Sequence, residues 1–343
     1  PAMKLKTLLT AAATALAFAV APAHAEKIIK LHHLNVDDPF ESTTGAMVTV
    51  FKNLVESGTG GSVKVQTFPN GQLGKDNEVL SQVKGGLVQA GIFSVGGFAS
   101  AYPMIGVLDV PFLFPDISTT YTVFDGPFGQ KLAADIEAKT GMAVLGFGDS
   151  GGFFAITNSK KAIKTPADMA GLKIRTMTSE PHKRIISSLG GQPAAIAWAE
   201  VYTALQTGVA DGQMNPVPII TMAKFNEVQK HITLTDHLFA PYVWVMNRKF
   251  FDSLTADEQA VVKSAAKSAI VANRGISRII EASAKGLPAL AKTMTVTSLT
   301  PAEKAAFRNA AQPAVKAYVS ETFGKEGEEM LRALEQAVET AGK

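Results

Sequence analysis

The residues best suited to chemistry stand in a glycine-rich run at 148–152, with the sequence Gly-Asp-Ser-Gly-Gly. The run contains the G-x-S-x-G pattern, in which a sharp turn from strand to helix presents a nucleophilic serine. Residues 153–157 (Phe-Phe-Ala-Ile-Thr) are instead extended in character, and the similar trypsin-like signature would need an all-β domain with His and Asp upstream. We therefore interpret the run as a flexible crossover between two lobes. A serine hydrolase acting through Ser150 is the alternative.

Two further patterns are associated with cofactors or metals. Residues 146–151 fit G-x-G-x-x-G, but this pattern binds a dinucleotide only where a helix N-terminus follows, and no helix is expected there. His32 and His33 are adjacent on an expected strand, so their side chains point to opposite faces and do not converge on one ion. One of them is expected to line a cleft. The sequence therefore predicts no cofactor, no metal site and no catalytic residue.

The amino-acid composition excludes several classes of binding partner and of chemistry. The formal net charge is +3 with no basic block, which gives no electrostatic footprint for nucleic acid. The chain has no cysteine, and this excludes disulfides and thiolate chemistry. A basic start, the apolar run Leu8–Val20 and the small-x-small segment at 23–25 are typical of a cleaved signal peptide. Export to a periplasm is expected.

Any site must be positioned by the alternating strands and helices that the sequence predicts. The first elements are expected at 27–34 (strand), 40–57 (helix), 63–68 (strand), 76–85 (helix, with Asp76 near its N-cap) and 90–95 (strand). This order is typical of a mainly parallel sheet with helices on both faces. Two more strands are expected at 142–147 and 153–157, leaving this first lobe.

A long helical pattern follows the second lobe. It begins after Thr255, a predicted N-cap, and continues to about Lys285, before Gly286 and Pro288. A helix of about 30 residues spans about 45 Å, enough to brace two lobes. The predicted division is 1–25, tag remnant plus cleaved signal peptide; 26–149 with about 237–255, lobe 1; 150–236 with about 290–300, lobe 2; 256–289, bridging helix; 301–343, C-terminal helices packed on the lobes.

Five segments occur in an order that is more specific than any one of them. They are 69–74 (PNGQLG), 108–114 (LDVPFLF), 168–175 (DMAGLKIR), 199–208 (AEVYTALQTG) and 209–216 (VADGQMNP). With this set the chain resembles the DctP-like solute receptors of tripartite ATP-independent periplasmic (TRAP) transporters, over nearly its whole length after the signal peptide. The resemblance implies an α/β, two-lobed periplasmic-binding-protein fold with mixed sheets and a long helix bracing both lobes.

The resemblance also implies a carboxylate ligand buried between the lobes. In this family the Arg of the G-L-K-x-R block, here Arg175, pairs with the ligand carboxylate, and a guanidinium binds a carboxylate through two parallel hydrogen bonds. The Asn of the D-G-Q-x-N-P block, here Asn215, contacts the ligand as well. Without the ordered segments, Arg175 would be interpreted as a surface ion pair and Asn215 as a turn residue before Pro216.

One departure from the family pattern bears on selectivity. Phe154 stands near the position where many relatives carry a second Arg, and Trp198 stands where an aromatic residue often lines the ligand site. Fewer cations favour a small or hydrophobic monocarboxylate, such as a 2-oxo, 2-hydroxy or aromatic acid, over dicarboxylates and sialic acid. This expectation assumes that no other Lys or Arg reaches the cleft.

The remaining predictions complete the functional hypothesis. His33, Asp76, Ser94 and Tyr242 are also assigned to the ligand site. The expected partners are the small carboxylate and the integral-membrane subunits of a TRAP transporter. The chain is expected to be a monomer, with a homodimer as the alternative. A receptor of an ATP-driven (ABC) importer shares the two-lobed shape and is the second alternative function.

Overall fold

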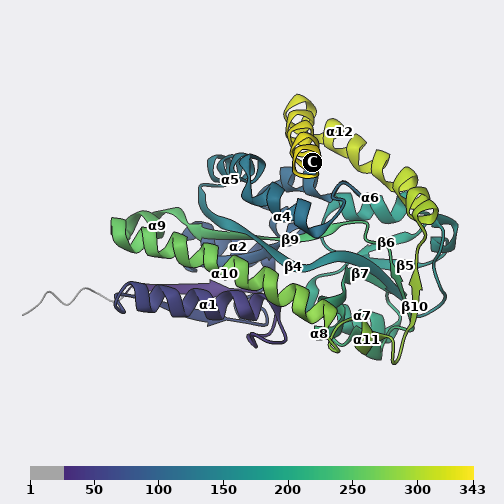
Figure 1. Ribbon diagram of the computed structural model, residues 1–343, viewed down its shortest axis with the longest axis horizontal. Helices are drawn as coiled ribbons and strands as arrows, with labels where there is room; N and C mark the ends of the chain where they lie inside the picture. Colours follow the sequence, from purple (N-terminus) through teal and green to yellow (C-terminus); the bar gives the residue numbers. More distant parts are fainter. Residues whose placement is uncertain (1–26) are drawn as a thin grey trace, which may run out of the picture.

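A computed structural model describes residues 27–343 (Figure 1). The predicted signal peptide and its cleavage site lie outside the described residues. Within residues 27–343, no helix combines the length and apolar character needed to cross a membrane.

The strands of the described chain form one mixed sheet in the order β2-β1-β3-β9-β4-β7-β5-β6, with β8 pairing with β4 and β10. Their bounds are β1 Lys27–His32, β2 Val63–Phe68, β3 Ala90–Ser94, β4 Met142–Asn158, β5 Lys173–Thr176, β6 Gln192–Ala195, β7 Gly212–Pro216, β8 His231–Leu234, β9 Phe239–Asn247 and β10 Thr295–Ser298. Strands β1, β2 and β3 pair in parallel, whereas β9 is antiparallel to both β3 and β4. We call β2, β1, β3 and β9 the first lobe, and β5–β8 with β10 the second lobe.

Strand β4 belongs to both lobes. It is one 17-residue strand, not the two strands expected from the sequence. Its register with β9 shifts between Asp149 and Phe153, which marks a β-bulge. Gly152 has φ +90 at this bulge, a backbone conformation that residues with a Cβ rarely adopt. The run at 148–152 is therefore not the flexible crossover that was predicted, because it lies within the strand and Asp149 is fully buried.

Helices cover both faces of the sheet (Figure 1). The α-helices are α1 Thr43–Gly58, α2 Asp76–Gly85, α3 Val95–Phe98, α4 Ile117–Asp125, α5 Pro127–Thr140, α6 Glu180–Ser188, α7 Val201–Thr207, α8 Val217–Met222, α9 Arg248–Ser253, α10 Ala256–Ala282, α11 Leu287–Leu290 and α12 Pro301–Ala341. Short 3-10 turns are η1 Pro103–Asp109, η2 Pro166–Met169, η3 Trp198–Glu200 and η4 Phe225–Glu227. Helix α2 has the bounds predicted, and Asp76 is its first residue, directly after the N-cap Lys75.

Helix α10 is the predicted bracing helix. The Thr255 hydroxyl accepts from the Glu258 amide, and the Glu258 carboxylate accepts from the Thr255 amide, so a capping box fixes its start. The helix ends at Ala282, earlier than the predicted 289, and its 27 residues correspond to about 40 Å. It packs against α1 of the first lobe, β4, and α8 of the second lobe.

Helix α12 closes the side of the molecule opposite α1. Gly324, with φ 55 and ψ −141, interrupts the helical backbone and bends the element into two arms (Figure 1). These arms pack on α4, α5, α6 and η1, so they contact both lobes.

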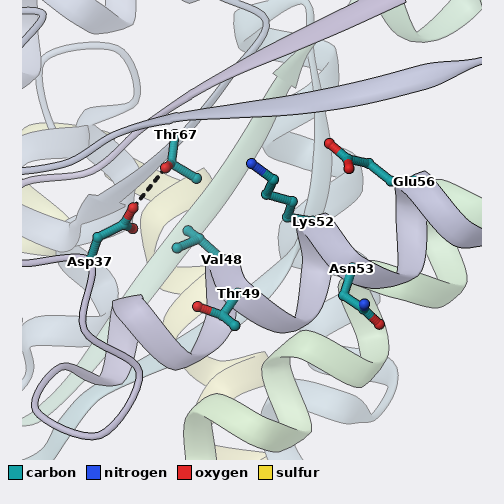
Figure 2. Close-up of a pocket in the computed structure, with 7 residues that line it drawn as sticks. All are labelled: Asp37, Val48, Thr49, Lys52, Asn53, Glu56 and Thr67. Carbon is teal, nitrogen blue, oxygen red and sulfur yellow. Dashed lines mark hydrogen bonds between the residues drawn. The ribbon is translucent and has the colours of Figure 1, made fainter. Parts of the chain in front are cut away.

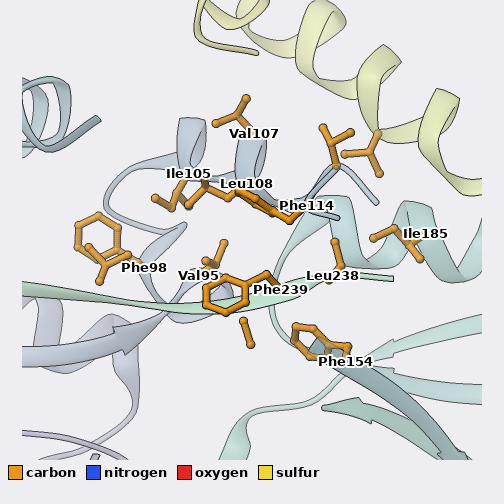
Figure 3. Close-up of a cluster of buried hydrophobic side chains, with 14 of the residues drawn as sticks. Val95, Phe98, Ile105, Val107, Leu108, Phe114, Phe154, Ile185, Leu238 and Phe239 are labelled. Carbon is orange, nitrogen blue, oxygen red and sulfur yellow. The ribbon is translucent and has the colours of Figure 1, made fainter. Parts of the chain in front are cut away.

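The largest hydrophobic core continues from one lobe into the other. Figure 3 shows part of it, extending from Phe98 at one end past Phe239 to Phe154 and Ile185 at the other. A second core lies between the sheet and helices α1 and α10, where Phe51 meets Trp244 edge-on at a centroid distance of 4.7 Å. Burial of apolar surface stabilises a contact by about 25 cal/mol per Å². Because the core is continuous, this stabilisation holds the two lobes together at their base.

Candidate ligand-binding site

A cavity of about 1010 Å³ lies between the two lobes, a size typical of small-molecule sites. We call it the central cavity. Residues of both lobes line it, and those used below are His33, Asn35, Lys75, Asp76, Ser94, Ser150, Arg175, Trp198, Asn215 and Tyr242. Seven of the eight residues assigned to the ligand site from the sequence therefore line one cavity, and the exception is Phe154.

The first-lobe wall is built at the ends of strands. His33 follows β1 directly, and Ser94 ends β3, so both stand at the carboxyl edge of parallel strands, where open α/β sheets hold ligands. Tyr242 on β9 pairs with Ser94 across the sheet. Its buried hydroxyl accepts a 2.6 Å hydrogen bond from Asn35 Nδ2. Burial raises the pKa of Tyr242, although hydrogen bonds from Ser150, Thr44 and Asn35 act in the opposite direction.

The second-lobe wall is built by neighbouring parallel strands. Arg175 on β5 pairs with Gln213 on β7, and paired residues in a parallel sheet share a face. Asn215 lies two residues beyond Gln213 and therefore on that same face, where its Nδ2 donates to Gln213 Oε1 at 2.7 Å. Trp198, at the start of η3, places its ring centroid 6.0 Å from the Arg175 guanidinium carbon. Arg175, Asn215 and Trp198 thus converge on the cavity.

Arg175 is a buried cation without an anion. The residue is 2% exposed, and its Nε donates to the Ile196 carbonyl at 2.9 Å. Its Nη1 has no hydrogen-bond partner, and within residues 27–343 the guanidinium forms no ion pair. Burial lowers the pKa of Arg175 to about 10, while the nearby charge of Asp76 partly opposes the shift. The side chain remains cationic at neutral pH and is ready to receive a carboxylate.

Asp76 faces the cavity from the first residue of α2. Its Oδ1 is buried and has no hydrogen-bond partner among the described residues. The His32 Nε2 lies 3.9 Å away, beyond hydrogen-bond distance. A Cβ on Gly97 would lie 1.8 Å from Asp76 Oδ2, so glycine at 97 leaves the space that this carboxylate occupies. His32 itself is fully buried with its ring 5.7 Å from that of Phe93, so His32 packs while His33 lines the cavity.

His33 links the central cavity to a smaller one. Its Nε2 lies 3.1 Å from Asp37 Oδ1, and the Thr67 hydroxyl donates to Asp37 Oδ2 at 2.7 Å. The His33 hydrogen bond is the largest influence that lowers the pKa of Asp37. Asp37, Thr67 and Lys52 line a pocket of about 290 Å³ between α1 and β2 (Figure 2).

Phe154 was assigned to the ligand site, and the structure places it elsewhere. Phe154 pairs with Pro216, whereas its neighbour Ala155 pairs with Asn215. Adjacent strand residues point to opposite faces, so Phe154 points away from the face that carries Asn215. The ring is 2% exposed and packs in the core against His182 and His237 (Figure 3).

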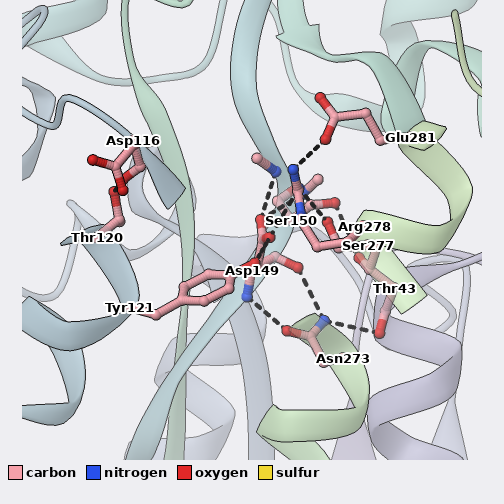
Figure 4. Close-up of polar contacts among 12 residues, drawn as sticks. Thr43, Asp116, Thr120, Tyr121, Asp149, Ser150, Asn273, Ser277, Arg278 and Glu281 are labelled. Atoms are coloured by element: carbon pink, nitrogen blue, oxygen red, sulfur yellow. Dashed lines mark hydrogen bonds and ion pairs between the residues drawn. The ribbon is translucent and has the colours of Figure 1, made fainter. Parts of the chain in front are cut away.

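The glycine-rich run is held by a buried polar cluster. Asp149 Oδ1 accepts from the amides of Gly151 and Gly152, and Oδ2 accepts from the Tyr121 hydroxyl and Arg278 (Figure 4). Asn273 of α10 donates to the carbonyls of Thr43 and Asp149.

Ser150 stands beside this cluster. It lines the cavity, and its backbone carbonyl accepts from the Thr43 hydroxyl at 3.0 Å. In the described chain no histidine is hydrogen-bonded to Ser150, so the serine–histidine pair of a hydrolase is not formed.

A second cation reaches the cavity, contrary to the assumption made from the sequence. Lys75, the residue before Asp76, lines the cavity from the first lobe. Its Nζ lies 2.8 Å from Glu200 Oε1, so the charge is already paired with a carboxylate of the second lobe. Both side chains are more than half exposed, which places the pair at the cavity mouth.

The arrangement defines a class of protein. Two lobes share a central strand and a bracing helix, and they enclose a cavity with a buried, unpaired guanidinium. These are the features of a solute-binding protein that receives an anion.

Comparisons with known proteins identify the family. The sequence pattern of the family described as "Bacterial extracellular solute-binding protein, family 7" (DctP) matches residues 37–322, and the chain belongs to this family. A solute-binding protein of Verminephrobacter eiseniae is 39% identical over 301 residues, 88% of either chain. The C4-dicarboxylate-binding periplasmic protein DctP of Rhodobacter capsulatus is 37% identical over 320 residues, covering 92% of this chain and 93% of the relative.

A solved structure shows the same architecture. The TRAP periplasmic solute-binding protein of Polaromonas sp. JS666, bound to D-erythronate, is 35% identical, with a TM-score of 0.83 over 90% of this chain and 98% of its own. Together with the family membership, this confirms the predicted TRAP-type, periplasmic solute receptor and its two-lobed fold. The family consists of receptors and not enzymes, so the hydrolase and ATP-driven alternatives lose their support.

Proposed function

We propose that the protein binds a small organic monocarboxylate in the central cavity and delivers it to the membrane subunits of a TRAP transporter. The observation that carries the proposal is Arg175, a buried cation whose Nη1 has no partner. A buried charge without a partner is costly, and a ligand carboxylate supplies the missing anion through two parallel hydrogen bonds.

The rest of the cavity supports a ligand with a single carboxylate. Trp198 is half-buried beside Arg175 and offers an apolar surface to the remainder of a 2-oxo, 2-hydroxy or aromatic acid. Burial of that remainder contributes about 25 cal/mol per Å². The D-erythronate of the Polaromonas relative is such a monocarboxylate.

Among residues 27–343, the cavity lining offers no free cation for the second charge of a dicarboxylate once Arg175 holds the first. Lys75 is paired with Glu200, and a carboxylate near Asp76 would meet a like charge. An unpaired buried charge costs several kcal/mol, which offsets much of a micromolar affinity of about 8 kcal/mol. The Rhodobacter capsulatus relative is named for C4-dicarboxylates, so succinate is the most informative competitor.

Thermal unfolding in the presence of single acids tests the proposal. A ligand at 100 times its Kd stabilises the folded state by about 2.7 kcal/mol. We expect 2-hydroxy, 2-oxo or aromatic monocarboxylates to raise the Tm, and succinate, malate and sialic acid to leave it unchanged. Tighter binding of succinate than of every monocarboxylate would show that Lys75 leaves Glu200 for the ligand and would contradict the proposal.

A further inference from the structure

A series of buried polar side chains leads from the central cavity into the second lobe. It begins at Asn215 of β7, which lines the cavity. It continues through Gln213 of β7 and Thr157 of β4 to Gln229, which precedes β8. None of the four side chains is more than 2% exposed. We call them the polar relay. Because buried polar groups are costly unless they are hydrogen-bonded, their bonds determine how each side chain is oriented.

Two backbone carbonyls set the direction of the polar relay at its inner end. Gln229 Nε2 donates to the Val228 carbonyl at 3.0 Å and to the Asp211 carbonyl at 3.3 Å. A carbonyl oxygen only accepts, so the amide nitrogen of Gln229 must face these two groups. Gln229 Oε1 therefore faces away from them, and it accepts from the Thr157 hydroxyl at 2.8 Å.

The same direction extends to Asn215. The Thr157 hydroxyl gives its one proton to Gln229, so its oxygen accepts from Gln213 Nε2 at 3.0 Å. Gln213 Oε1 then faces Asn215, whose Nδ2 donates to it at 2.7 Å. Among residues 27–343 this is the one hydrogen bond of the Asn215 side chain. Its second N–H and its carbonyl oxygen remain for a solute.

We infer that Gln213, Thr157 and Gln229 are positioning residues that orient the Asn215 amide for solute binding. The inference rests on the proposed function, because it requires that the solute contacts Asn215. The three positioning residues do not themselves line the cavity, so they act through Asn215. An amide that is already oriented loses less conformational entropy on binding. Without the polar relay, the Asn215 amide is free to rotate by half a turn and exchange its N–H and carbonyl groups.

Substitution of Thr157 separates positioning from packing. Thr157→Val keeps the shape of the side chain but removes the hydroxyl, which leaves Gln213 Nε2 and Gln229 Oε1 without that partner. Thr157→Ser restores the hydroxyl. The matched control is Thr233→Val, on the neighbouring strand β8. Thr233 is 1% exposed, and its hydroxyl donates to the Ile163 carbonyl, outside the polar relay.

Isothermal titration calorimetry with D-erythronate, 2-oxobutanoate and benzoate as probes measures the affinity of each variant. We expect Thr157→Val to weaken binding of the tightest of these acids at least fivefold, and Thr157→Ser to stay within twofold of the unchanged protein. Gln213→Met removes the acceptor of Asn215 without adding a charge and should weaken binding as Thr157→Val does. Thr233→Val should lower the Tm as much as Thr157→Val and change the affinity less than twofold.

Hydrogen exchange of the Asn215 side-chain amide, followed by NMR on ¹⁵N-labelled protein, is a readout that needs no solute. We expect this amide to exchange with water at least tenfold more slowly than that of Asn309, an exposed position of α12. Thr157→Val and Gln213→Met should accelerate the exchange at Asn215, and Thr233→Val should not. If the relay variants do not fold, exchange in the unchanged protein decides alone.

The outcomes separate the inference from the proposed function. Affinity of Thr157→Val within twofold of the unchanged protein would overturn the inference and leave the monocarboxylate receptor intact. An equal loss of affinity in Thr233→Val would show that general destabilisation is the cause, and would overturn it as well. Equal exchange rates at Asn215 and Asn309 would mean that the amide is not held. If none of the three acids binds the unchanged protein at millimolar concentration, the proposed function fails and the inference fails with it.

Discussion

At the scale of single residues, Arg175 combines two properties that rarely occur together. It is 2% exposed, and yet one of its donors has no partner among residues 27–343. Its backbone anchor, the Ile196 carbonyl, holds Nε and leaves Nη1 available for a ligand. Because Trp198 lies near the guanidinium, the orientation of the fork is restricted before a ligand enters, which reduces the entropy lost on binding.

We expect Arg175→Lys to weaken ligand binding by more than tenfold, which corresponds to about 1.4 kcal/mol or more. Lysine retains the charge but lacks the planar fork that binds a carboxylate through two parallel hydrogen bonds. Isothermal titration calorimetry with the acid that raises the Tm most measures the change. Arg332→Lys, at an exposed position of α12, is the control. Equal affinity of Arg175→Lys and the unchanged protein would remove Arg175 as the carboxylate anchor.

The sequence predicted which segments form the cavity more reliably than it predicted the orientation of each side chain. Arg175 and Asn215, which the ordered motifs assigned to the ligand site, both line the central cavity. Phe154 was assigned from its position in the family pattern, and such a position does not tell which face of a strand the side chain occupies. Phe154 pairs with Pro216 while Ala155 pairs with Asn215, so the Phe154 side chain points to the opposite face, into the core. The pairing of Lys75 with Glu200 was also not predictable, since the two residues are far apart in sequence.

At the scale of elements, the molecule depends on how α10 is tied to the first lobe. Glu258 in its first turn accepts from Lys27 Nζ of β1 at 2.7 Å and from the Ser62 hydroxyl before β2 at 2.8 Å. The residue is 8% exposed. Burial alone would raise the pKa of Glu258, but Lys27, the Thr255 amide and Ser62 outweigh it and hold the pKa near 2, below the ordinary 4.5.

The depressed pKa of Glu258 predicts a pH-dependent contribution to stability. Because the folded pKa lies below the unfolded value, the contribution is complete above pH 4.5 and is lost as the pH falls toward 2. We expect Glu258→Gln to lower the free energy of unfolding by about 2 kcal/mol at pH 7 and by much less at pH 3. Urea denaturation at both pH values measures the difference.

The control for this prediction is Glu329→Gln, an exposed position of α12. It should change stability by less than about 0.5 kcal/mol at either pH. A Glu258→Gln penalty that is the same at pH 3 and pH 7 would mean that the carboxylate charge contributes nothing and that only the shape of the capping box matters.

The elements themselves show where the sequence pattern is ambiguous. The glycines in the run at 148–152 predicted a break between two strands, yet the chain continues as the single strand β4. The reason is Asp149, whose carboxylate accepts from the Gly151 and Gly152 amides and so replaces the ladder bonds that the bulge removes. Conversely, the C-terminal helices predicted over 301–343 correspond to α12, whose helical backbone is interrupted at Gly324.

At the scale of the whole molecule, the lobes are joined at the base and in contact at the mouth. The continuous core, α10 and α12 connect them behind the cavity. At the front, Lys75 and Glu200 form an ion pair between the lobes, and Thr178 Oγ1 donates to the Gly96 carbonyl at 3.4 Å. An exposed ion pair contributes at most about 1 kcal/mol, so the contacts at the mouth are the weak ones.

This asymmetry predicts how the receptor closes. Strand β4 near 148–152 and the 235–243 segment that leads into β9 pass from one lobe to the other. We expect these ordered crossings to act as the hinge through small changes of backbone angles, without local unfolding. The weak mouth should open in the absence of ligand, because breaking one exposed ion pair and one long hydrogen bond costs little. A ligand that contacts both lobes supplies the interaction that shifts the population toward the closed form. Small-angle X-ray scattering should therefore give a smaller radius of gyration with saturating ligand than without.

Lys75→Ala should enlarge the radius of gyration of the free protein and leave that of the liganded protein unchanged. Lys249→Ala, at an exposed position on α9, should alter neither radius. An identical radius with and without ligand would mean that the cleft is fixed and that the solute enters without movement of the lobes.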